Sequence, residues 1–303
     1  MNASALVHVL IALVAAPLLP GLINRIKALV AGRQGPPVLQ LYYDLAKLFR
    51  KGAVYSRTTT WVFRASPLVG VAAVALALTL IPSGGVPALA AFPGDVILMA
   101  YALGLARFFL VLAALDTGSS FEGMGASREV TFSALAEPAF LLALAAMLRL
   151  AGNPSLTAAL VAPMPHGLLE QLPVVLLVAA ALLLVLLTEN ARVPVDDPNT
   201  HLELTMIHEV LILDYSGPDL ALALYGAALK LWLFSAVLAQ VLLSGLPADP
   251  WLRGAAHLVG VIAVAAFIGL IESGMARLRL VRVPHLLVAA GAFALLALCW
   301  GPR

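Results

Sequence analysis

The chain has 303 residues, of which 62% are hydrophobic and only 11% are charged, and its formal charge at pH 7 is +2. A soluble domain carries about 25% charged residues, so this composition excludes an ordinary soluble enzyme. Continuous apolar runs of about 18 residues or more recur, and each can cross about 30 Å of hydrocarbon, whereas a membrane β-barrel would show alternating strands. We therefore predict an all-α polytopic membrane protein, folded as a single transmembrane bundle over residues 1–303.

The apolar runs predict about eight transmembrane helices. The first, over about 3–29, lacks the features of a cleaved signal peptide, and Pro20-Gly21 is its expected kink. Leu39 to Phe49 then predicts a short amphipathic helix lying at the membrane interface, with a solvated connector as the alternative. The other spans are expected over about 67–81 (or from nearer Trp61), 96–115, 130–150, 172–187, 220–243, 255–271 and 284–300.

Lysine and arginine are distributed unevenly between the loops. The loops after the first, third, fifth and seventh spans hold 13 of them, and the opposite side holds three. The positive-inside rule makes the basic side cytoplasmic, which places cytoplasmic loops at about 30–65, 116–129, 189–219 and 272–283. The single cysteine, Cys299, excludes a structural disulfide within the chain and an iron–sulfur cluster held by it, which needs about four thiolates.

Six charged residues fall within the predicted spans or at their ends: Arg107, Glu129, Glu137, Glu189, Lys230 and Glu272. A charge at mid-bilayer costs about 2.5–3.5 kcal/mol, so such residues usually face the protein interior and serve function. Glu129 and Glu137 lie about 80° apart around a helix and can line one cavity. Alternating acids and bases predict a proton relay for coupling, and ion pairs that only hold helices together are the alternative.

The stretch from Glu189 to Pro218 is unusually acidic for this chain. Pro194 and Pro198 interrupt a continuous helix, and a cytoplasmic loop helix is expected over about 201–213. We expect a cavity and a surface that docks a soluble partner, which we call the arm. The residues expected to form them are Arg33, Arg128, Arg192, Asp196, Asp197, His201, Glu203, His208, Glu209 and Asp214. The potential metal ligands scatter around the predicted helix, so no metal site is predicted. No catalytic arrangement or nucleotide fingerprint occurs, so we expect no catalytic residue in this chain.

The same stretch carries a family resemblance. Residues 189–198, Glu-Asn-Ala-Arg-Val-Pro-Val-Asp-Asp-Pro, resemble the Glu-x-x-Arg-x-Pro-hydrophobic-Asp-x-Pro signature of the membrane subunit 1 family of respiratory complex I. The segment from Arg33 to Pro37 is similar to that family's first cytoplasmic loop, and 277–284 is similar to its basic loop before the last helix. Arg128 followed by Glu137 resembles its fourth-helix pattern.

Two departures point to one branch of this family. Asn199 and His201 stand where the complex I branch usually has acids. Residues 201–209 and 213–218 are instead similar to the membrane subunit of energy-converting (group 4) nickel–iron hydrogenases, including formate hydrogenlyase subunit 4.

The resemblance implies a membrane anchor and coupling subunit that binds no cofactor itself. The iron–sulfur clusters and the nickel–iron centre would belong to the hydrogenase small and large subunits and a ferredoxin-like subunit on the cytoplasmic side. Antiporter-like membrane subunits would be further partners, translocation would move protons or sodium ions, and the complex would lie in a bacterial or archaeal cytoplasmic (inner) membrane. No nucleic-acid partner is expected.

Two other functions stay open at this point. One is the quinone-site membrane subunit of a complex I-type NADH:quinone oxidoreductase, in which Arg33, Asp196 and Glu203 would line a quinone tunnel. The other is a stand-alone ion transporter, although no internal repeat of the kind that builds many transporters is visible in the sequence.

Overall fold

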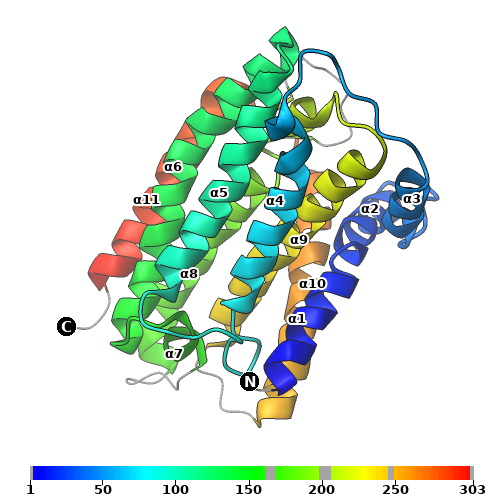
Figure 1. Cartoon of the computed structure of the whole chain (residues 1–303). Helices are drawn as coiled ribbons and strands as arrows, with labels where there is room; N and C mark the ends of the chain where they lie inside the picture. Colours follow the sequence, from blue (N-terminus) through cyan, green and yellow to red (C-terminus); the bar gives the residue numbers. More distant parts are fainter. Residues whose placement is uncertain (1–2, 162–167, 198–205, 245–248, 301–303) are drawn as a thin grey trace.

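The computed structural model describes residues 3–161, 168–197, 206–244 and 249–300. The helices are α1 (Ala3–Ala15), α2 (Leu18–Val30), α3 (Gln40–Phe49), α4 (Trp61–Thr79), α5 (Asp95–Asp116), α6 (Ser120–Ala151), α7 (Leu156–Val161), α8 (Leu168–Glu189), the 3-10 helix η1 (Glu209–Ile212), α9 (Gly217–Leu243), α10 (Pro250–Gly274), the 3-10 helix η2 (Leu280–Arg282) and α11 (Val283–Trp300). They form one elongated bundle (Figure 1), and within these ranges the only β-pairing is an isolated bridge, Ser83–Val86. The all-α prediction is confirmed.

The number of membrane spans also agrees with the prediction. Seven described helices are long and apolar enough to cross a membrane, and the bent pair α1–α2 raises the number to eight. The start of α1 and the end of α11 lie at the same end of the bundle (Figure 1), as an even number of spans requires. The chain is a multi-pass membrane protein.

The bend in the first span is misplaced in the prediction. The pair bends by 51° at the break between Ala15 and Leu18, and not at Pro20-Gly21. Pro17 supplies the break, since its ring clashes with the preceding turn and it has no N–H to donate. Pro20 falls in the first turn of α2, where a proline is tolerated. Gly21 has another role: a Cβ there would lie 2.0 Å from the carbonyl oxygen of Val38, so only glycine permits this backbone contact.

The helix α6 is longer than predicted. It begins at Ser120 instead of about 130, so most of the loop expected over 116–129 is helical. Its first turns contain polar side chains that find partners inside the protein. The buried Glu122 accepts a hydrogen bond of 3.1 Å from the backbone N–H of Asp214, and Arg128 donates one of 2.7 Å to the carbonyl of Met206. Hydropathy alone therefore starts this helix about ten residues too late.

The predicted loop helix over 201–213 is wrong for the residues that the structure describes. Residues 201–205 lie outside them, and the remainder forms only the 3-10 helix η1. This segment packs directly on α6: a Cβ on Gly125 would lie 2.2 Å from Cγ1 of Val210. The conformation of this segment is therefore determined by its contacts with α6 and not by its intrinsic helix propensity. The short helix α7 was not predicted either.

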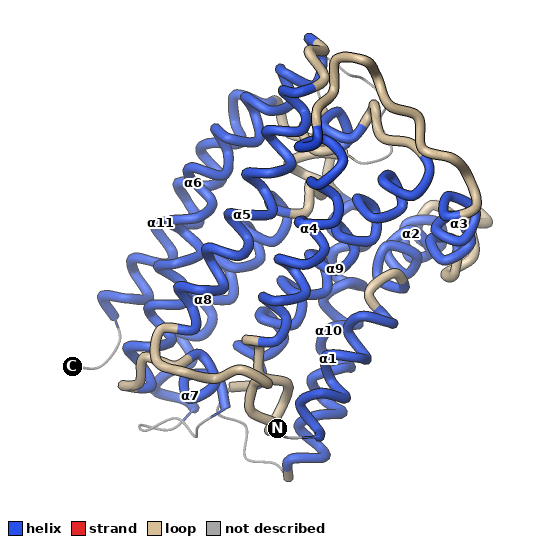
Figure 2. The backbone as a smooth tube through the Cα atoms, viewed as in Figure 1, coloured by secondary structure: helices blue, strands red, loops and turns tan. Residues whose placement is uncertain are grey.

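The predicted amphipathic helix is present as α3, and it leads into a long connection that we call the strap, residues 50–60. Figure 2 shows the strap as a loop arching from α3 to the start of α4. Val54 N–H donates to Oγ of Ser216 over 2.8 Å, and the Tyr55 hydroxyl donates to Asp219 over 2.7 Å. The strap is thereby fixed to the start of α9, the most buried span, 72% of whose apolar window lies inside the bundle.

Candidate functional site

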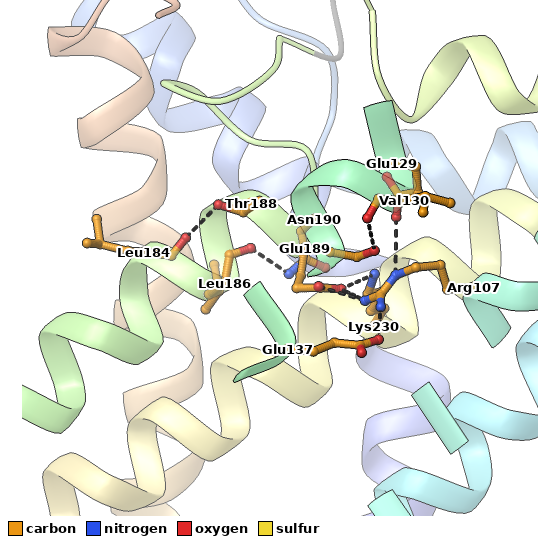
Figure 3. Close-up of polar contacts among 11 residues, drawn as sticks. Arg107, Glu129, Val130, Glu137, Leu184, Leu186, Thr188, Glu189, Asn190 and Lys230 are labelled. Atoms are coloured by element: carbon orange, nitrogen blue, oxygen red, sulfur yellow. Dashed lines mark hydrogen bonds and ion pairs between the residues drawn. The ribbon is translucent and has the colours of Figure 1, made fainter. Parts of the chain in front are cut away.

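Five charged side chains from four helices meet inside the bundle, and we call them the central ion cluster: Arg107 (α5), Glu129 and Glu137 (α6), Glu189 (α8) and Lys230 (α9). One guanidinium nitrogen of Arg107 lies 2.6 and 2.7 Å from the two carboxylate oxygens of Glu189. Another is hydrogen-bonded to Glu137, and Nε lies 3.5 Å from Glu129. Nζ of Lys230 lies 2.7 Å from Glu189 (Figure 3). Sequence reasoning placed all five within the predicted spans or at their ends, and the structure brings them together.

The cluster lies well within the bundle. Arg107 is only 9% exposed and precedes the end of α5 by nine residues, or about 14 Å along the helix. Three carboxylates face two cations, so the fully ionised cluster carries one net negative charge. Burial of such charges is tolerated only when they are paired, and each contact here is charge-assisted. The geometry therefore gathers one more acid than base inside the bundle.

A tight turn after α8 joins this cluster to the acidic loop. Ala191 has a positive φ of 48° and ends the helix, and the Val193–Pro194 peptide is cis. The turn buries Asp196, which accepts hydrogen bonds from the N–H groups of Asp197 and Ile207 and lies 2.8 Å from Arg277. Asp196 thus holds together the turn, the segment before η1 and the loop before η2.

A second group of charges lies between α2 and α10, and we call it the α2–α10 ion cluster. Glu272, whose side chain is fully buried, lies 2.8 Å from Nζ of Lys27 and 3.5 Å from Nη1 of Arg192. The sequence grouped Glu272 with the relay residues, but its partners here are different from those of the central ion cluster. Lys27 falls within the span predicted over about 3–29, but sequence reasoning counted it with the cations of the following loop and not with the relay residues.

The predicted docking residues that the structure describes differ in their exposure. Arg33 is exposed on the loop after α2, Asp214 is exposed before α9, and Arg128 and Asp196 are turned inward. Glu209 begins η1 and Asp197 follows the turn. His201 and Glu203 lie outside the described residues. Sequence reasoning missed Glu122, an acid in the first turn of α6, because the predicted span began only at about residue 130.

Two pockets flank the central ion cluster. The inner pocket, of about 70 Å³, lies among α4, α5, α6 and α9 and has Arg107, Glu129, His208 and Lys230 in its otherwise mostly apolar wall. The lateral pocket, of about 500 Å³, lies among α5, α6, α8 and α9 and has Arg107, Glu137 and Glu189 in its wall. The side chain of Glu137 is 50% exposed, which makes it the most accessible acid of the cluster.

The sequence can now be compared with known proteins. A family model described as NADH dehydrogenase matches residues 3–300. The chain belongs to the NADH dehydrogenase family. The predicted resemblance to the membrane subunit 1 family of complex I is confirmed, and a complex I-like membrane subunit is the class to which this chain is assigned.

Within the NADH dehydrogenase family, two Escherichia coli (strain K12) proteins are similar to this chain. Formate hydrogenlyase subunit 4 is 32% identical over 298 residues, 96% of each chain. Hydrogenase-4 component C is 35% identical over 233 residues, 75% of this chain and 70% of the relative. A chain in the structure of the membrane-bound sulfane sulfur reductase, an archaeal respiratory membrane complex, shares the fold with a TM-score of 0.79 and 22% identity, covering 97% of this chain and 98% of that one.

Among the residues that the structure describes in this NADH dehydrogenase family member, no group of three or more His, Cys, Asp or Glu is arranged to hold a metal ion. Cys299, on α11, is exposed and free. The acids near the cluster are instead paired with arginine and lysine, which compete with a cation for the same oxygens.

His208, in the wall of the inner pocket, gives a testable pH dependence. Burial lowers its pKa below the ordinary value of 6.5, and nearby Lys230 acts in the same direction against the opposing effect of Glu129. The folded state then keeps His208 neutral where the unfolded chain binds a proton. Stability should therefore fall as the pH drops below about 6.5, by up to about 1.4 kcal/mol per pH unit from this group.

Thermal unfolding of the detergent-purified protein between pH 5 and 7.5 checks this expectation. His208→Gln should flatten the acid side of the profile, whereas the exposed His285→Gln should leave it unchanged. A wild-type slope that persists in His208→Gln would assign the acid sensitivity to other groups.

Proposed function

We propose that this chain is the membrane anchor and coupling subunit of a multi-subunit energy-converting hydrogenase of the formate hydrogenlyase type. One observation carries the proposal: the central ion cluster is continuous with the loop after α8. Glu189 pairs with Arg107 and Lys230, and within seven residues the same turn supplies Arg192 to Glu272 and Asp196 to Arg277. The similarity to formate hydrogenlyase subunit 4 and hydrogenase-4 component C supports this complex type.

In this proposal the soluble arm docks on the basic loop before α4 and the acidic loop before α9. The iron–sulfur clusters and the nickel–iron centre belong to the hydrogenase small and large subunits and to a ferredoxin-like subunit. Antiporter-like subunits lie beside the chain in a bacterial or archaeal cytoplasmic (inner) membrane. The composition of the site fits this division, since the cysteine needed for such clusters occurs only once in the chain.

The proposed coupling step uses the charge imbalance of the central ion cluster. A change of charge in the arm shifts the turn that carries Glu189, Arg192 and Asp196, which weakens or strengthens the contact of Glu189 with Arg107. When Arg107 is drawn away from Glu137, that carboxylate loses its nearest cation. Uptake and release of a proton at the accessible Glu137 would then follow the redox state of the arm.

Glu137→Gln tests this step directly. Glutamine keeps the size and the hydrogen bond to Arg107 but cannot release a proton, so redox-driven ion movement should fall at least tenfold while hydrogen production continues. The measurement compares both activities in inverted membrane vesicles containing the assembled complex, with the exposed Glu170→Gln as a matched control. Unchanged ion movement in Glu137→Gln would remove this residue from the relay.

The quinone-site alternative is less well supported by the geometry. Asp196 is already saturated by two backbone N–H groups and Arg277, and Arg33 is exposed outside the wall of the inner pocket. Two of the three expected quinone contacts are therefore not aimed at that pocket, and the third, Glu203, lies outside the described residues. Binding of a quinone analogue to the purified complex would favour the alternative, and copurification of a nickel–iron subunit would favour the hydrogenase.

A further inference from the structure

The outer face of α5 and α6 combines a carboxylate with an open pocket. Glu137 lies 17 residues after the start of α6, or about 26 Å along this helix, which places it near the middle of a 32-residue span. Its side chain is nevertheless 50% exposed. Gly104 of α5 lies opposite, and a Cβ at that glycine would be 4.0 Å from Oε1 of Glu137, so the absent side chain leaves the carboxylate accessible.

The lateral pocket extends from this carboxylate along α5. Its wall runs from Arg107 to Ile97, a separation of ten residues or about 15 Å, and is otherwise mostly apolar. Tyr101, in the same wall, is 75% exposed, and Ile97 is 60% exposed. Figure 1 shows α5 and α6 beside each other on one outer face of the bundle. The exposure of Tyr101, Ile97 and Glu137 places the lateral pocket and its acid on the periphery of this chain.

An exposed carboxylate at this depth is incompatible with bare hydrocarbon. Ionisable groups in membrane spans are expensive unless they face protein or water and have a partner. Arg107 and Lys230 bring two positive charges to three carboxylates, and Glu137 is the acid whose side chain is most exposed. Arg107 is paired with Oε1 of Glu137, and among the described residues Oε2 has no hydrogen bond or ion pair. A helix that covers this face can therefore satisfy Oε2 with a positive charge or a hydrogen-bond donor.

We infer that the α5–α6 face docks a transmembrane helix of a different membrane subunit, which fills the lateral pocket with apolar side chains and places a basic or hydrogen-bond-donating side chain against Glu137. The inference rests on the proposed function, because it requires membrane subunits beside this chain. Beyond the proposed function, the inference specifies which face of this chain contacts the neighbouring subunit and which side chain that subunit contributes.

Two other occupants fit the observations less well. A lipid acyl chain matches the apolar wall but brings no donor to the depth of Glu137. A second copy of this chain, related by a two-fold axis, would present the same negatively charged face, since such a contact uses one surface twice. A different helix with a donor satisfies both the apolar wall and the charge.

The experiment replaces Tyr101 with the photocrosslinking amino acid p-benzoylphenylalanine, which keeps an aromatic ring at this position. Native membranes containing the whole complex are irradiated, and crosslinked peptides are identified by mass spectrometry. The exposed Trp300 on α11 receives the same amino acid as a matched control. A second variant, Glu137→Leu, removes the charge, and the subunits that copurify with it are compared with those of the wild type.

We expect the crosslinker at position 101 to react with a transmembrane segment of another subunit, with a yield at least tenfold above that at position 300. This segment should contain Lys, Arg, His or a neutral hydrogen-bond donor. We expect the Glu137→Leu variant to lose most of that subunit on purification. Crosslinking to lipid or to a second copy, a segment without a donor, or full retention of the subunit in Glu137→Leu would overturn the inference. Copurification of the hydrogenase subunits is scored in the same preparations. If they are present while the crosslink fails, the inference falls and the proposed function stands, and if they are absent from the wild-type preparation, the proposed function itself fails.

Discussion

Arg107→Gln should destabilise the protein by about 3–5 kcal/mol and abolish coupled ion movement. The substitution leaves Glu129, Glu137 and Glu189 with Lys230 as the one cation of the central ion cluster, and removing one partner from a buried charge network leaves the others uncompensated. Differential scanning fluorimetry of the purified complex measures the first effect, and ion uptake driven by hydrogen production in vesicles measures the second.

A paired variant separates charge balance from general damage. Arg107→Gln combined with Glu189→Gln removes one charge of each sign, so it should regain part of the lost stability without regaining ion movement. The recovery is incomplete because Lys230 loses its 2.7 Å ion pair with Glu189. Arg64→Gln is the matched control, because Arg64 is exposed and lies over the ring of Tyr55 outside the cluster. Stability in Arg107→Gln equal to that of the control would show that the cluster does not hold the helices together.

Lys27→Met should lower the stability by about 3 kcal/mol, near the lower end of the range for a broken buried pair. It leaves the buried carboxylate of Glu272 with Arg192 alone, at 3.5 Å. The Lys27 side chain is 23% exposed, so solvent screens its ion pair with Glu272 and the expected loss of stability is smaller than for a fully buried pair. The same fluorimetric measurement applies, and proteolysis of the loop after α2 gives a local readout of separation between α2 and α10.

The double variant Lys27→Met/Glu272→Gln should recover most of the lost stability, since no buried carboxylate charge is then left behind and only the 3.5 Å contact of Arg192 is missing. Arg25→Met, an exposed cation on the same helix, should have little effect. If the double variant is as unstable as Lys27→Met, the destabilisation comes from lost packing of the lysine chain and not from the carboxylate.

Much of the fold could be predicted because the bilayer imposes a simple rule on sequence. The apolar runs long enough to span appear as single helices or, for the first run, as the bent pair α1–α2, and the amphipathic segment before α4 appears as α3. Two of the errors share one cause. The start of α6 and the segment around η1 contain polar groups, such as Glu122 and Arg128, that bond to backbone atoms distant in sequence. Local hydropathy and propensity contain no information about those partners.

The same distinction holds for the site, where the sequence selects charged residues but does not show which of them are partners. The energetic cost of charges in membrane spans was enough to select Arg107, Glu137, Glu189 and Lys230 without any structure. It could not show that Glu272 belongs with Lys27, because pairing depends on which helices pack together. Asp196 was assigned to docking, yet its carboxylate is used to hold the loop, a role that only the hydrogen bonds to Asp197 and Ile207 reveal.

The contact between the strap and the start of α9 has a mechanical consequence. A Cβ on Gly217 would lie 2.6 Å from the carbonyl oxygen of Gly52, so the two backbones touch with no side chain between them. Lys230 follows Gly217 by 13 residues on the same uninterrupted helix, about 20 Å along its axis. A partner that displaces the strap therefore also displaces α9, and with it Lys230 in the central ion cluster. This mechanical connection does not pass through the turn after α8.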